Sequence, residues 1–318
     1  MRYALMTEPQ QGLSYDEILA AARAAEDAGL EAFFRSDHYA SFPGESGRPT
    51  TDAWTTLGGL ARETSTIRLG VLVSPVTFRI PGTLAKVIQT ADEMSGGRVE
   101  AGFGAGWNAD EHEQLGIPFP GIGERFDRLE EQMAIIHGLW TEDDGWTYEG
   151  RHWRVSGSRR HGDIARAGRR HPHIIFGGKG NARLARLVAR FGDEFNLNSA
   201  SATDVPEAYA RVRAACHAEG RDPDEVVYSA MTGVLVAESE ADLRVRVADL
   251  LGELGLADAD GEAWLAERRG RWIMGTPDEA MERVRALEAL GTQRVMLQDF
   301  LPRDLDHVAL LGRTFAAP

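Results

Sequence analysis

The sequence is poor in cysteine and in positive charge. Cys216 is the single cysteine among 318 residues, which excludes an internal disulfide and fits a reducing compartment such as the cytoplasm. Acidic residues outnumber basic ones by 49 to 35, and the formal net charge is −14. This balance argues against a surface for nucleic acid or an anionic membrane, because phosphate binding depends largely on lysine and arginine.

Long apolar runs and common catalytic signatures are also missing. No window approaches the ~20 apolar residues of a membrane span, and the N-terminal run is shorter than a signal peptide requires. The nine histidines show no His-x-x-x-His spacing, and no Gly-x-Ser-x-Gly elbow occurs. We therefore expect a cytoplasmic protein with no metal site, no nucleic-acid or membrane partner, and a small-molecule substrate.

Apolar strand-like runs alternate with helical patterns from end to end. Ser14 with Glu17 three residues later predicts a capping box at a helix start, and Pro81 suits the first turn of another helix. The predicted strands lie at residues 3–6, 31–36, 67–73, 98–101, 173–176, 194–197, within 226–236 and at 294–297. Helices are predicted at residues 14–29, 52–64, 81–94, 123–140, 181–191 and 205–219, and from residues 240 and 304 onwards.

Eight strand–helix repeats predict the fold class. They indicate an α/β protein, a single (β/α)8 TIM barrel over residues 1–318, rather than an open sheet. Residues 41–51, 146–168 and 256–275 do not fit the repeat and are expected as insertion loops, the second of them beginning with a hairpin-like piece.

Barrel enzymes place their sites at the carboxyl ends of the strands. The residues that follow the predicted strands should therefore face one cavity, and they are Ser36–His38, Ser74–Arg79, Gly104–Asn108, Gly177–Asn181, Asn196–Ser199 and Gln298–Asp299.

Two glycine clusters stand out in this set. Gly102, Gly104 and Gly106 leave a strand end almost without side chains, so its backbone can approach a flat or anionic ligand. Gly177–Gly180 precedes a helix, where free N–H groups favour a phosphate and Lys179 adds charge. The alternative for this second cluster is a tight strand-to-helix turn that needs glycine only for its geometry.

Asp37 and His38 end a predicted strand at the same mouth. A histidine can pass a proton near neutral pH, and a buried carboxylate would tune it. His38 is therefore the candidate catalytic residue, the alternative being a packed or solvated histidine. The two side chains are adjacent in the chain and need not contact each other.

Several motifs together resemble one family. Ser36-Asp-His38, Gly70–Arg79, Ser95-Gly-Gly-Arg98 and Gly102-x-Gly-Ala-Gly-Trp107, followed by Glu111–Gly116 and Arg125–Trp140, are similar to the luciferase-like monooxygenase superfamily. The similarity is to its branch that uses the deazaflavin coenzyme F420, and it covers about residues 1–200. The motifs are less specific for F420 over FMN than for the superfamily.

The resemblance implies a role for each matching position. Asp37 and His38 would border the tricyclic ring, and a bulge at Leu72–Val73, often with a non-proline cis peptide, would brace it with Ser74 and Thr77 nearby. Ala105, Gly106 and Asp110 would contact the ring and the ribityl chain. The phosphate would be held by Gly177, Gly178, Gly180 and Asn181.

Two departures from the family pattern affect the substrate and the coenzyme's tail. Deazaflavin-dependent sugar-phosphate dehydrogenases carry a catalytic glutamate where Trp107 stands, so glucose 6-phosphate is not expected as a substrate. Residues 158–170 form a basic stretch in place of a proline-rich connection. We expect this stretch either to be disordered or to contact the coenzyme's acidic tail.

The resemblance implies an F420-dependent oxidoreductase that transfers a hydride to or from an organic substrate, with relatives that commonly form homodimers. An FMN-dependent luciferase-like monooxygenase is the first alternative. A non-catalytic flavin-binding barrel is the second.

Overall fold

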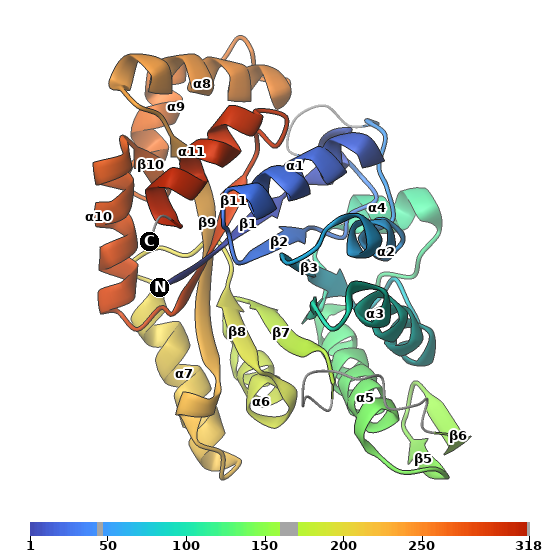
Figure 1. Ribbon diagram of the computed structural model, residues 1–318. Coiled ribbons are helices and arrows are strands. Elements are labelled where there is room, and N and C mark those ends of the chain that lie inside the picture. Colours follow the sequence, from blue (N-terminus) through green and yellow to red (C-terminus); the bar gives the residue numbers. More distant parts are fainter. Residues whose placement is uncertain (43–46, 160–170, 317–318) are drawn as a thin grey trace.

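Eight parallel strands close into a barrel with helices around it, in a computed structural model that describes residues 1–42, 47–159 and 171–316 (Figure 1). The order around the barrel is β9-β11-β1-β2-β3-β4-β7-β8, and β8 pairs with β9 to complete the circle. The bounds are β1 Arg2–Thr7, β2 Ala32–Arg35, β3 Arg68–Pro75, β4 Val99–Gly104, β7 His173–Gly178, β8 Glu194–Leu197, β9 Val227–Val236 and β11 Arg294–Asp299. The predicted TIM barrel is confirmed.

Helices cover the outside of the barrel (Figure 1). The predicted capping box begins α1: the Ser14 side chain accepts from the Glu17 N–H, and Glu17 Oε2 accepts from the Ser14 N–H at 2.8 Å. The helices that follow barrel strands are α1 Tyr15–Asp27, α2 Ala53–Glu63, α3 Pro81–Ser95, α5 Ile122–Thr141, α6 Ala182–Phe191, α7 Val205–Ala218, α8 Glu240–Glu253 and α11 Leu305–Phe315.

The remaining elements lie in the connections. A short helix, α4 Ala109–Leu115, follows β4, and an antiparallel hairpin, β5 Trp146–Glu149 with β6 Arg154–Ser158, follows α5 and confirms the predicted hairpin-like piece. After α8 come α9 Gly261–Arg268, β10 Ile273–Gly275 and α10 Pro277–Ala289. Two 3-10 helices, η1 Pro9–Gln11 and η2 Pro223–Glu225, complete the set. Among the described residues, no helix combines the length and apolar character needed to span a bilayer.

The inside of the barrel is apolar in its middle. Ala4, Met6, Phe34, Ile175 and Met296 all point inward there and are almost fully buried. These side chains fill the barrel, so any ligand must bind at one of its ends.

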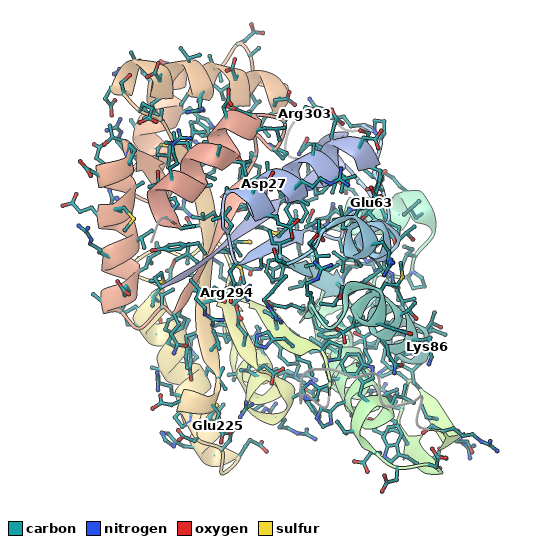
Figure 2. The ribbon with its side chains drawn as sticks, viewed as in Figure 1. Asp27, Glu63, Lys86, Glu225, Arg294 and Arg303 are labelled. Atoms are coloured by element: carbon teal, nitrogen blue, oxygen red, sulfur yellow. The ribbon has the colours of Figure 1, made fainter. Side chains whose placement is uncertain are left out.

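The amino ends of the strands carry a buried ion cluster around Arg294, which Figure 2 labels among the barrel strands. Nη1 of Arg294 lies 2.6 Å from Oε2 of Glu100 and 3.1 Å from Oε2 of Glu194. Glu194 Oε2 is also 3.0 Å from Nε2 of His173, and Arg294 Nε lies 2.9 Å from Oε2 of Glu31. Desolvation would raise the pKa of Glu100, but Arg294, His173 and Arg68 together more than offset it, so the pKa lies below its usual range.

The same cluster has the ligand types of a metal site. One ligand atom each from Glu100, His173 and Glu194 lies within 4.8 Å of the other two. The guanidinium of Arg294 already supplies the positive charge that a cation would bring. The carboxylates of the cluster are thus already paired with positive charge, and we infer that the cluster stabilises the barrel.

Candidate active site

A cavity of about 490 Å³ opens at the carboxyl ends of the strands, within the size range of small-molecule sites. Every barrel strand contributes to it, either directly or through the loop that follows. Its wall is formed by Met6, Glu8, Ser36, Asp37, His38, Phe42, Leu72, Val73, Pro75, Gly104, Ala105, Gly106, Trp107, Glu111, Ile122, Phe126, Gly177, Gly178, Lys179, Asn181, Leu184, Asn198, Ser199, Met231 and Gln298.

Most of the residues predicted for the site share this cavity. Asp37, Gly106 and Gly178 come from three different strand ends and line the same hollow, so the expected convergence is confirmed. The predicted residues in the wall are Asp37, His38, Leu72, Val73, Ala105, Gly106, Gly177, Gly178 and Asn181.

Four predicted residues lie outside the wall. Ser74 is buried behind it against Trp54, and Thr77 lies 2.6 Å from Nε2 of the buried His112. Asp110 is exposed on the first turn of α4, and Gly180, at φ +67°, packs against Phe195. The basic stretch predicted to meet the coenzyme's tail lies, for residues 160–170, outside the described residues.

His38 pairs with Glu111 and not with its neighbour Asp37. Nδ1 of His38 lies 3.0 Å from Oε1 and 3.1 Å from Oε2 of Glu111, which sits on α4 with its side chain 2% exposed. Oε2 of Glu111 also accepts the N–H of Tyr39 at 2.9 Å, which fixes the carboxylate. An ionised carboxylate only accepts, so Nδ1 carries a proton and Nε2 is the nitrogen available to a substrate.

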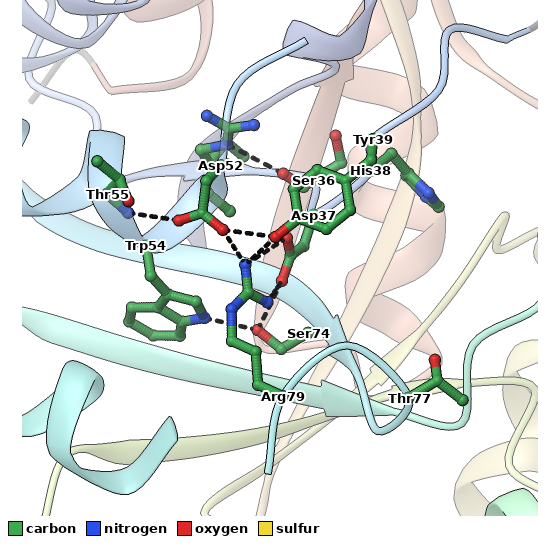
Figure 3. A network of polar contacts seen from close by, with 12 residues as sticks. Ser36, Asp37, His38, Tyr39, Asp52, Trp54, Thr55, Ser74, Thr77 and Arg79 are labelled. Carbon is green, nitrogen blue, oxygen red and sulfur yellow. Dashed lines mark hydrogen bonds and ion pairs between the residues drawn. The ribbon is translucent and has the colours of Figure 1, made fainter. Parts of the chain in front are cut away.

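The carboxylate of Asp37 is turned away from His38 into a network around Arg79 (Figure 3). Arg79 bonds both Asp37 and Asp52, and it donates to the hydroxyl of Tyr39 at 2.8 Å. Burial would lower the pKa of Arg79, but the two carboxylates raise it above its ordinary value. Asp37 therefore anchors the end of β2 to the segment after β3.

The same network holds the bulge of β3. Oγ of Ser74 donates to Asp37 at 3.1 Å and accepts from Trp54 Nε1 at 2.7 Å (Figure 3). The register between β3 and β4 shifts between Val71 and Ser74, and the peptide between Leu72 and Val73 is cis, as the resemblance implied.

Glycines on the two following strands make room for this bulge. A Cβ on Gly104 would lie 2.6 Å from Cγ2 of Val73, and one on Gly177 would lie 2.7 Å from its Cγ1. Real Cβ atoms do not approach that closely, so both positions exclude a side chain. The result is a smooth wall formed by Val73 and bare backbone, suited to a flat molecule.

The loop after β7 leads into the N-terminus of α6. Asn181 is the N-cap residue, and its side chain accepts the N–H groups of Arg183 and Leu184. Nζ of Lys179 lies 2.7 Å from the carbonyl oxygen of Asn198, close to this turn. Backbone N–H groups, a helix dipole and an ammonium thus gather at one edge of the cavity.

Sequence reasoning missed the acidic floor of the cavity. Glu8 follows β1 directly, its Oε2 accepts from Nε2 of Gln10 at 2.8 Å, and its Oε1 accepts from Nε2 of Gln298 at 2.6 Å. Gln298 was selected by the rule that site residues follow the carboxyl ends of the barrel strands. The same rule applies to β1, so it could have predicted Glu8. The pairing of Glu111 with His38 had no local signal, because 73 positions separate them.

Comparisons with known proteins agree with this architecture. An uncharacterised protein of Mycobacterium tuberculosis is 31% identical over 220 residues, covering 64% of this chain and 74% of its own. The F420-dependent glucose-6-phosphate dehydrogenase of Nakamurella multipartita is 29% identical over 304 residues, covering 88% of this chain and 85% of its own. A solved F420-dependent secondary alcohol dehydrogenase shares the fold with a TM-score of 0.79 at 18% identity, covering 99% of this chain and 98% of its own.

The family assignment comes from the length of the match. Residues 1–294 match the family described as luciferase-like monooxygenase, a stretch that includes all the barrel strands up to the first residue of β11. The chain belongs to the luciferase-like monooxygenase family.

Proposed function

We propose that this protein is an F420-dependent oxidoreductase that transfers a hydride between the deazaflavin and a small organic substrate. The observation that carries the proposal is the His38–Glu111 pair beside a wall of bare backbone in one cavity. The F420-dependent relative, aligned over most of both chains, supports F420 as the cofactor.

The residues present fit such a coenzyme. The smooth face at Val73, Gly104 and Gly177 excludes side chains where a flat ring needs contact. Leu72, Val73, Ala105 and Gly106 would hold the ring, with Asp37 and His38 at its border. Gly177, Gly178 and Asn181 would hold the phosphate at the start of α6, where N–H groups favour anions.

The bound deazaflavin would supply the two-electron redox chemistry. His38 then moves the substrate's proton through Nε2, and Glu111 holds the ring in the tautomer that leaves Nε2 accessible. Glu8 and Gln298 form a polar floor, and the Arg79 network keeps β2 and β3 in position. The four predicted residues that lie outside the wall would affect the ligand only through their neighbours. They are Ser74, Thr77, Asp110 and Gly180.

Equilibrium titration of the purified protein, separately with F420 and with FMN, tests the cofactor. We expect F420 to bind at least about tenfold more tightly. Preference for FMN together with oxygen consumption would instead indicate the flavin monooxygenase. Binding without turnover on a broad substrate panel would indicate a non-catalytic barrel.

The role of His38 needs a separate variant. His38→Ala should cut turnover by about 10²-fold or more, the usual range for loss of a positioned acid–base group, while F420 affinity stays within a few fold. Unchanged turnover would reject the role of His38.

A further inference from the structure

Two large apolar residues of the cavity wall are exposed. The side chain of Trp107 is 63% exposed, and Ile122, at the start of α5, is 54% exposed. The Trp107 ring meets Phe42 edge-on at 4.9 Å, and Phe42 meets His38 edge-on at 4.5 Å. Large apolar groups that gather at the mouth of a cavity indicate a ligand with an apolar face.

This wall reaches the reacting centre. The ring centroids of Trp107 and His38 are 5.7 Å apart, close enough for one bound molecule to contact both rings. Phe126 continues the apolar surface one turn along α5. The part of a substrate next to its reacting carbon would therefore lie among aromatic and aliphatic groups.

The charge of the wall disfavours an anionic substrate. Among the described residues of the wall, Lys179 is the one with a permanent positive charge, and its ammonium is held by the carbonyl oxygen of Asn198. Glu8, Asp37 and Glu111 are acids in the same wall, and Glu8 lies on its floor with both carboxylate oxygens bonded to amides. A carboxylate or phosphate beside His38 and Trp107, away from the α6 N-terminus, would lose its hydration, and no described residue of the wall would offer a free cation there to replace it.

We propose that the substrate is an uncharged alcohol, or the corresponding ketone, that carries a bulky alicyclic or aromatic group. The inference rests on the proposed function. The ring group packs between Phe42, Trp107 and Ile122, and the oxygen faces Nε2 of His38.

In the oxidising direction the carbinol C–H bond would break, and bound F420 would accept its hydride with both electrons. The hydroxyl proton passes to Nε2 of His38 and the C=O bond forms. The alcohol thus loses two electrons and F420 gains two.

Paired alcohols provide the test with the full-length protein and F420. 1-Phenylethanol and cyclohexanol are compared with lactate and glucose 6-phosphate by the loss of deazaflavin absorbance, after F420 binding has been measured. We expect kcat/KM for the uncharged pair to be at least about tenfold higher. If F420 binds but the charged pair is preferred, or neither pair reacts, the inference is overturned while the coenzyme assignment stands. If F420 does not bind, the proposed function itself fails.

The apolar wall is tested with Trp107→Ala. We expect kcat/KM for 1-phenylethanol to fall about tenfold, mainly through KM, as for other lost pocket contacts, with F420 affinity within about threefold. Val245→Ala is the matched control, because Val245 is 61% exposed on α8 and outside the cavity. An unchanged KM for 1-phenylethanol in Trp107→Ala would contradict the role of the wall.

Discussion

Nδ1 of His38 lies 3.0 Å from Oε1 of Glu111, although 73 positions separate the two residues in the chain. The pair joins the end of β2 to the helix α4, and Glu111 is further fixed by the N–H of Tyr39. It orients the one imidazole in the wall of the cavity among the residues that the structure describes.

Glu111→Gln should lower kcat about tenfold to a hundredfold, because a neutral amide no longer fixes one tautomer of His38. F420 affinity and KM should change by less than about threefold. Steady-state kinetics and a binding titration measure these quantities. Glu113→Gln, an exposed position on the same helix, serves as the control and should leave kcat unchanged. Equal losses in the two variants would rule out a positioning role for Glu111.

Gly177→Ala should weaken F420 binding by about tenfold or more, since its Cβ would lie 2.7 Å from Val73 and displace the smooth wall. Overpacking of this kind typically costs about 1–3 kcal/mol. Fluorescence titration measures the affinity. Gly252→Ala on α8 is the control, because nothing lies within 4 Å of the added Cβ. Full F420 affinity in Gly177→Ala would contradict this account of the wall.

Arg294→Met should destabilise the protein by about 3–5 kcal/mol, because it removes the guanidinium that contacts both buried carboxylates and leaves Glu100 with Arg68 alone and Glu194 with His173 alone. Urea unfolding measures the difference. Arg313→Met removes an ion pair with Glu238 whose two side chains are 62% and 64% exposed, so it should cost at most about 1 kcal/mol. A similar small loss in both variants would show that the buried cluster contributes little.

The same cluster predicts how stability depends on pH. Burial raises the pKa of Glu100 and of Glu194, but Arg294 and His173 together bring both below the ordinary value of 4.5, with Arg68 also acting on Glu100. Their contribution is therefore complete above about pH 5 and is lost as the pH falls through the lower folded-state pKa values. Glu100→Gln should flatten the decline of the unfolding free energy between about pH 5 and pH 3. An unchanged slope in that range would argue against this linkage.

The pKa of His173 is shifted in the opposite direction, upwards. Burial lowers its pKa, but the bond to Glu194 and the nearby Glu100 raise it above the ordinary value of 6.5. Its stabilising charge is present below about pH 6.5 and is lost as the pH rises through the higher folded-state pKa. The difference in melting temperature between the wild type and His173→Gln should therefore shrink between pH 6 and pH 9. A constant difference would mean that the charge of His173 does not contribute.

The sequence predicted the barrel because each strand and helix carries its own local signal. Ser14, Pro81 and Asn181 mark helix starts that the structure confirms, and the apolar runs match the strands to within a few residues. The helices α4, α9 and α10 and the strand β10 were not predicted. β10 has only three residues and forms by pairing with the end of β9, a contact that no local pattern encodes.

Some features of the site could likewise be predicted from local sequence, whereas others depend on contacts between residues far apart in the chain. The strand-end rule placed His38, Gly106 and Gly178 in one cavity. It could not show that Asp37 turns to Arg79, 42 positions away, because such partners are set by the closed barrel. The homodimer and the cytoplasmic location remain predictions, which analytical ultracentrifugation and cell fractionation can check.

The ion cluster and the cavity occupy opposite ends of the same strands. β4 carries Glu100 and then Gly104, and β7 carries His173 and then Gly177, so the two ends lie about 13 Å apart at ~3.3 Å per residue. Mutational tolerance should differ accordingly along each strand. Laboratory evolution of a new substrate range can therefore vary Phe42, Trp107 and Ile122, because these residues are separate from those that stabilise the barrel.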